Sequence, residues 1–150
     1  MAKQQVFSAT QFTPTEFDTA EDKAKFANQY VALVLSGFAP HKFPEWFYRR
    51  LSNTFDHIAH YDKAGFWDEW FSNLAVQIAF LEDALRYFPC GFPTHTYSDV
   101  ERALQVWLKA HPEILQDIRN KLADRLEAEQ RRDYEALKAK FEPHTVTKEG

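Results

Sequence analysis

The chain has very little cysteine: Cys90 stands alone among 150 residues, so no disulfide can form within the chain. The first residues lack the apolar segment of a secretory signal. The longest apolar run, 30–35, is much shorter than the roughly 20 residues that a membrane-spanning helix needs. These absences predict a cytoplasmic protein that folds without covalent cross-links.

Basic charge and catalytic motifs are also scarce. The net charge of −4 gives no general excess of Lys and Arg for binding the phosphates of a nucleic acid. The chain contains no Gly-rich phosphate loop, no Gly-x-Ser-x-Gly turn and no His-Glu-x-x-His zinc motif. Cys90 and His95 share a loop, but no sequence feature positions the imidazole as a base for the thiol. We therefore predict a protein without enzymatic activity and without a cofactor.

Glycine is rare and aromatic residues are frequent, at four glycines and 16% Phe, Trp and Tyr. A chain of this length can bury a sizeable core as one domain. Apolar residues recur at helical spacing through most of the sequence. We predict an all-α fold, a compact bundle of about five helices with a long C-terminal helix. The expected helices span 19–36, 44–61, 66–88, 98–110 and 112–141.

The ends of these helices carry recognisable signals. Asp18 with Glu21, and Ser98 with Glu101, resemble capping boxes. Pro112 can occupy a first helical position, where its missing N–H is not needed. We expect one helical domain at 18–142. Residues 1–17 would form an N-terminal extension, packed on the body or mobile, and 143–150 a disordered tail.

The segment 43–71 is unusually rich in aromatic residues. Ten of its 29 residues are aromatic, more than one narrow core stripe would hide. This density predicts that some of the rings face another macromolecule. The ten are Phe43, Trp46, Phe47, Tyr48, Phe55, Tyr61, Phe66, Trp67, Trp70 and Phe71.

One face of the second expected helix is the best candidate for a partner-binding surface. Six side chains fall within about 100° of arc outside the apolar stripe if each residue turns by about 100°. They include Trp and Arg, the residue types most enriched at the energetic centres of protein interfaces. The six are Trp46, Arg49, Arg50, Asn53, His57 and His60. We predict a non-catalytic protein-binding module of the inhibitor or adaptor type, a type that phages and other mobile elements also carry.

The last helix is expected to be much longer than its neighbours and to project past the body. Leu115, Leu126 and Leu137 are eleven residues apart, which is close to three helical turns. An overhang with such a stripe favours pairing with a second copy of the chain. We predict a homodimer or other homo-oligomer, held by Leu126, Tyr134, Leu137 and Phe141.

Two alternative functions remain open from the residues alone. His57 and His60 lie on adjacent turns of a helix, and pairs at this spacing hold metals in some helical bundles. A helical-bundle metalloprotein is therefore the first alternative, although no matching motif supplies further ligands. The second alternative is nucleic-acid binding, because aromatic rings beside Arg can hold single strands.

Overall fold

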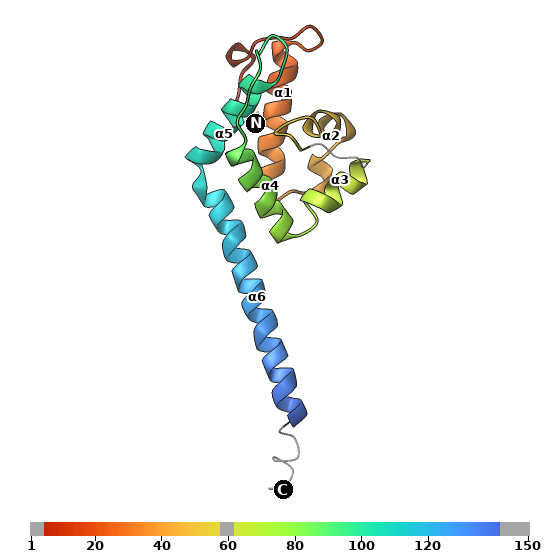
Figure 1. Ribbon diagram of the computed structural model, residues 1–150, viewed down its shortest axis with the longest axis vertical. Helices are drawn as coiled ribbons and strands as arrows, with labels where there is room; N and C mark the ends of the chain where they lie inside the picture. The colour runs from red at the N-terminus through yellow and green to blue at the C-terminus, as the bar shows by residue number, and fades with distance from the viewer. Residues whose placement is uncertain (1–4, 58–61, 142–150) are drawn as a thin grey trace.

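The computed structural model of the protein describes residues 5–57 and 62–141, and these residues form helices and loops only (Figure 1). The described helices are α1 Ala20–Leu35, α2 Glu45–Leu51, α3 Lys63–Trp70, α4 Leu74–Arg86, α5 Ser98–Ala110 and α6 Pro112–Phe141. Two short 3₁₀ turns, η1 Ala9–Gln11 and η2 Pro40–Lys42, precede α1 and α2. The predicted all-α class with a long C-terminal helix is confirmed, with six α-helices in the described ranges where about five were expected.

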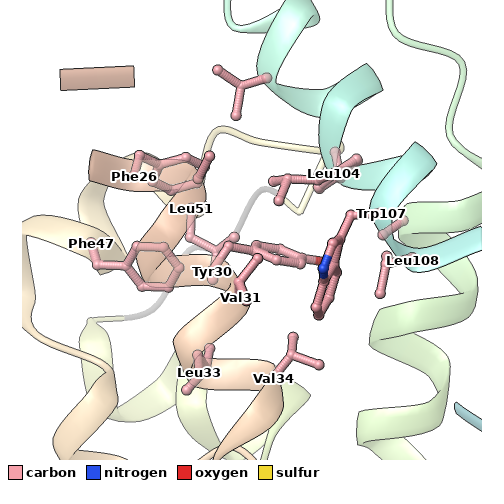
Figure 2. Packing of buried hydrophobic residues seen from close by; sticks show 14 of the residues in the cluster. Phe26, Tyr30, Val31, Leu33, Val34, Phe47, Leu51, Leu104, Trp107 and Leu108 are labelled. Atoms are coloured by element: carbon pink, nitrogen blue, oxygen red, sulfur yellow. The ribbon is translucent and has the colours of Figure 1, made fainter. Parts of the chain in front are cut away.

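Helix α1 lies at the centre of the core. Its side chains lie between those of α2 and those of α5, as Figure 2 shows for Phe47 and Leu51 on one side and Trp107 on the other. Tyr30 and Leu33 of α1 have no exposed surface. Full burial along one helix is typical of an element packed on several sides.

The start of α1 differs by one residue from the predicted capping box. Thr19 and Asp22 form the box, not Asp18 and Glu21: the Thr19 hydroxyl accepts a hydrogen bond from the Asp22 N–H at 3.0 Å, and the Asp22 carboxylate accepts one from the Thr19 N–H at 2.9 Å. The first orphan N–H groups of the helix are thereby satisfied. The Asp18 carboxylate is left to pair with Arg50.

The helix predicted at 44–61 is much shorter than expected, because α2 ends at Leu51. Phe55 and Asp56 have φ angles of 55° and 62°, values that a right-handed helix does not contain. The Glu101 carboxylate accepts a hydrogen bond from the Phe55 N–H at 2.8 Å, which satisfies a backbone donor in this turn. Glu101 is thus a partner of the turn and not the second member of a capping box at Ser98, whose hydroxyl donates to the Gly91 carbonyl.

The helix predicted at 66–88 is divided into α3 and α4. The Asn73 side chain accepts a hydrogen bond from the Val76 N–H at 3.0 Å and so caps a new helix at Leu74. The Asp62 carboxylate caps α3 in the same way through the Gly65 N–H. Apolar residues recur at helical spacing through both helices, so periodicity alone did not predict the break between them.

Most rings of the aromatic segment pack inside the protein, so the predicted surplus of exposed rings is largely wrong. The breaks after Leu51 and Trp70 turn the short helices α2 and α3 so that their rings meet in the core. The Phe43 ring, for example, contacts five neighbouring rings at centroid separations of 5.2–6.1 Å. The buried rings are Phe43, Phe47, Phe55, Phe66 and Phe71; Tyr48, Trp67 and Trp70 are half-buried, Trp46 is exposed, and Tyr61 lies outside the described residues.

The N-terminal extension is attached to the body over the residues that are described. The Asn28 side chain bonds both the N–H and the carbonyl of Phe7, and the Asp99 carboxylate accepts the Thr13 N–H at 3.0 Å. Phe7 and Phe12 are buried, whereas Phe17 is exposed. The predicted disordered tail at 143–150 lies outside the described residues.

Only the first part of α6 packs on the body, mainly against α4. Ile118 is buried, Leu122 is half-buried, and Arg119 pairs with Glu82 of α4 at 2.6 Å. The part from 123 to 141 extends past the other helices (Figure 1), and all of its residues are exposed except the half-buried Ala128. No helix in 5–57 or 62–141 combines the length and the apolar character that crossing a membrane demands.

Candidate protein-interaction site

A cleft of about 370 Å³ lies where α1, α2 and the turn before α5 meet. Trp46, Arg49 and Arg50 of the predicted partner-binding face are all in its wall. The remaining lining residues are Asp18, Asp22, Lys25, Phe26 and Tyr97. Three of the six predicted residues therefore share one hollow.

Trp46 is the one clearly exposed ring among the described aromatics of 43–71. It lies in the first turn of α2, which begins directly after Pro44, and its indole packs edge-on against the buried Phe47 at 5.8 Å. The Lys25 ammonium lies 4.4 Å from the centre of the Trp46 ring. With 38% of its surface exposed, Trp46 is held in position on one side and open to solvent on the other.

The two arginines differ in how firmly they are held. Arg49 is largely exposed and makes a helical i, i+4 ion pair with Glu45 at 3.2 Å. Arg50 lies 4.0 Å above the ring of Tyr97 and pairs with Asp18 at 3.4 Å. Burial raises the pKa of Tyr97 further above its ordinary value, and the neutral phenol ring faces the guanidinium. Arg49 can therefore reorient towards a partner, whereas Arg50 is fixed in the cleft wall by its two contacts.

Asn53 lies outside the cleft lining. It is exposed, and its side-chain amide donates to the Arg49 carbonyl at 3.2 Å. This hydrogen bond continues the last turn of α2 and helps to close its C-terminal end.

His57 lies in the core, so the prediction that its side chain belongs to the partner-binding face is wrong. Its ring stacks on Phe80 at 4.6 Å and contacts Trp70 at 4.8 Å. Burial lowers the pKa of His57 to about 3, so the imidazole is neutral at pH 7. The prediction failed because the helix ends at Leu51, after which helical angles no longer decide where a side chain points. His60 lies outside the described residues.

The metal alternative gains no support from the residues that the structure describes. Within them no group of three or more His, Cys, Asp or Glu side chains comes together as a metal site would require. Among the residues that the structure describes, the buried Nε2 of His57 has no hydrogen-bond partner, and the same holds for the Tyr30 hydroxyl and the Trp70 indole N–H. The rings of all three contact Phe80, so these polar atoms border an apolar centre.

The predicted oligomerisation residues lie on the projecting part of α6. Leu126, Tyr134, Leu137 and Phe141 are 49%, 61%, 55% and 65% exposed. Apolar side chains of this size on a helix surrounded by water form an interface candidate that is separate from the cleft.

Sequence reasoning missed the cleft residues that come from outside α2. Lys25 and Asp22 are on α1, and Tyr97 precedes α5, so only tertiary packing brings them beside Trp46. No local signal marks them, since each belongs to an ordinary helix or loop pattern in the sequence.

A larger hollow of about 720 Å³ separates the N-terminal extension from α1. Two of its lining residues, Phe7 and Asn28, are already joined to each other by hydrogen bonds. None of the described residues that line this hollow is Trp or Arg. The smaller cleft is the better candidate, because its wall places the partly buried Trp46 ring beside the exposed Arg49. Comparison with protein-family models, with curated proteins and with solved structures finds no match for this chain.

Proposed function

We propose that the protein is a non-catalytic protein-binding module of the inhibitor or adaptor type, which captures its partner at the cleft between α1 and α2. The gathering of Trp46, Arg49 and Arg50 in one wall is the observation that supports this function. Trp supplies a large rigid contact area, and Arg supplies fixed donors that grip a carboxylate or stack on a ring.

The charges of the cleft favour a protein over a nucleic acid. Its lining carries three basic residues, Lys25, Arg49 and Arg50, together with the acidic Asp18 and Asp22. A nucleic-acid backbone would meet repulsion from the two carboxylates, whereas a peptide can offer groups of both signs. A partner segment with an acidic side chain beside an apolar one fits Arg49 and Trp46 best.

Trp46→Ala is expected to weaken partner binding by at least about thirtyfold, since loss of an anchoring Trp typically costs about 2 kcal/mol or more of binding free energy. Thermal unfolding should change little because the ring is already partly exposed. The test is quantitative mass spectrometry of proteins retained by the immobilised chain. Phe88→Ala is the matched control, because Phe88 is 82% exposed and does not line the cleft. Equal retention by both variants would contradict the proposal.

Arg49→Glu is a cleaner charge test than Arg50→Glu. In the structure Arg50 stacks on Tyr97 and pairs with Asp18, so reversal there sets two carboxylates together and disturbs the cleft wall. Reversal at the exposed Arg49 affects only a surface pair, which contributes little to stability.

Leu126, Tyr134, Leu137 and Phe141 form an apolar stripe on α6, which is the second contact surface in this proposal. The stripe serves association of the chain with itself, while the cleft binds another protein. The two surfaces lie on different helices, so variants can disable them separately.

A further inference from the structure

We propose that the projecting part of α6 pairs with the same part of a second copy in antiparallel orientation, with the two-fold axis passing between Asp133 and Tyr134. This inference rests on the proposed role of the α6 stripe in association and adds the partner, its direction and its register. Residues 123–141 lie apart from the body, carry an uneven distribution of charge, and follow the part of α6 that packs against α4.

The part of α6 from 123 to 141 is isolated from the body, and its apolar side chains would be covered by a partner. It is about 28 Å long at roughly 1.5 Å per residue, and none of its large side chains is buried by the body. In proteins most of the stability of a helix comes from tertiary packing of its apolar face. A face carrying Leu126, Tyr134, Leu137 and Phe141 gains most when a second apolar stripe covers it.

The charges along this part are distributed unevenly. Residues 123–130 contain three acidic and one basic residues, a net charge of −2, and 131–141 contain four basic and two acidic residues, a net charge of +2. A parallel pair would set each half against its own sign. An antiparallel pair sets the acidic half of one copy against the basic half of the other, which is the favourable arrangement.

One antiparallel register brings apolar residues and opposite charges together. With the axis between Asp133 and Tyr134, Leu126 lies level with Phe141 of the second copy. The two-fold axis brings each flank of one stripe against the same flank of the other, so two charges can pair only if they lie on the same side of the stripe, and each pair occurs twice. At about 100° per residue, Glu127 and Lys138 lie on one side and Glu129 and Lys140 on the other, and the register sets each glutamate within about 3 Å, along the axis, of the lysine of the second copy. Glu127 already pairs with Arg131 in its own helix at 3.5 Å, an exposed contact that leaves its carboxylate accessible.

The position of helix α4 also excludes the parallel arrangement, independently of the charges. Leu115, Leu126 and Leu137 lie along nearly one line of α6, because eleven residues make about three turns. Leu115 packs against the core, and Arg119 pairs with Glu82, so α4 covers this side of α6 up to about Leu122. A parallel second helix would run into α4 of the first copy. An antiparallel helix ends beside Leu126, where the contact with α4 has ceased.

The test is charge reversal with compensation in the same chain. Glu129 and Lys140 are eleven residues apart, about 16 Å along one helix, so they cannot pair within a copy or across a parallel dimer. In sedimentation equilibrium the wild type is expected to dimerise, and Glu129→Lys to weaken dimerisation about tenfold. The double variant Glu129→Lys with Lys140→Glu is expected to restore wild-type association. Circular dichroism checks that α6 remains helical in each variant.

The results separate this inference from the proposed function. A monomeric wild type, or a double variant that associates no better than Glu129→Lys, overturns the antiparallel pairing. Either result leaves capture at the cleft to be judged by Trp46→Ala alone. Loss of capture in Trp46→Ala with intact dimers supports the cleft. Unchanged capture with rescued dimers removes the cleft and keeps the pairing.

Discussion

Replacing Lys23 by methionine is expected to lower the free energy of unfolding by about 3–5 kcal/mol, the range seen when one partner of a buried ion pair is removed. Lys23 has no exposed surface. Its ammonium donates to the carbonyls of Pro93 and Thr96 at 2.8 and 2.9 Å and to the Asp99 carboxylate at 2.9 Å. Methionine fills the space but leaves the Asp99 carboxylate without its opposite charge and the two carbonyls without the ammonium donor.

The loss should be visible as a lower midpoint in urea unfolding followed by circular dichroism. Lys25→Met is the matched control, since it makes the same substitution two residues away on the exposed side of α1. Adding Asp99→Asn to Lys23→Met should recover part of the stability, because the uncompensated charge is removed while the amide oxygen still accepts from one of the two backbone donors, Thr13 or Val100. Equal midpoints for Lys23→Met and Lys25→Met would show that the buried ammonium contributes no net stability.

Acid is expected to destabilise the protein through His57. Its pKa is near 6.5 in the unfolded chain and about 3 in the fold, so folding favours the neutral ring. The stabilising contribution is complete above pH 6.5 and is lost as the pH falls towards 3. Within that window each pH unit removes up to about 1.4 kcal/mol. His57→Phe preserves the stack on Phe80 and should flatten the loss of stability between pH 6 and pH 4.

Urea unfolding at a series of pH values measures this effect directly. His95→Phe serves as the control because His95 is exposed, and it should retain the wild-type acid dependence. Glu101 acts in the opposite direction, since burial raises its pKa and its protonation in acid therefore favours the fold. If His57→Phe follows the wild-type curve, the imidazole is not the group that makes the fold sensitive to acid.

The parts of the fold that sequence could predict are those decided by local chemistry. Helix α6 was placed at 112–141 because Pro112 marks its start and the apolar spacing continues, and α5 was placed at 98–110 for similar reasons. Helix α1 was placed within one residue at each end. Its cap was assigned one residue early, because both candidate boxes satisfy the same pattern of an acceptor followed by an acid.

The parts that could not be predicted depend on contacts between distant residues. The turn after α2 is stabilised by Glu101, which lies 46 residues after Phe55 in the sequence. A prediction that uses only neighbouring residues therefore extends the helix past Leu51. This one break moves His57 from the predicted face into the core. It also turns the rings of α2 and α3 inward. Of the six residues predicted for the partner-binding face, Trp46, Arg49 and Arg50 consequently lie together along the cleft, while the histidines contribute no described side chain to it.

Photo-crosslinking in cells that produce the chain tests the central claim, capture of another protein at the α1–α2 cleft, most directly. Benzoylphenylalanine replaces Lys25, an exposed residue that lines the cleft beside Trp46, in one variant and the exposed Phe88 in a second. Capture at the cleft predicts a distinct protein joined to the chain through position 25 and not through position 88. The absence of any cross-linked protein at position 25, or the same set of proteins at both positions, would contradict it.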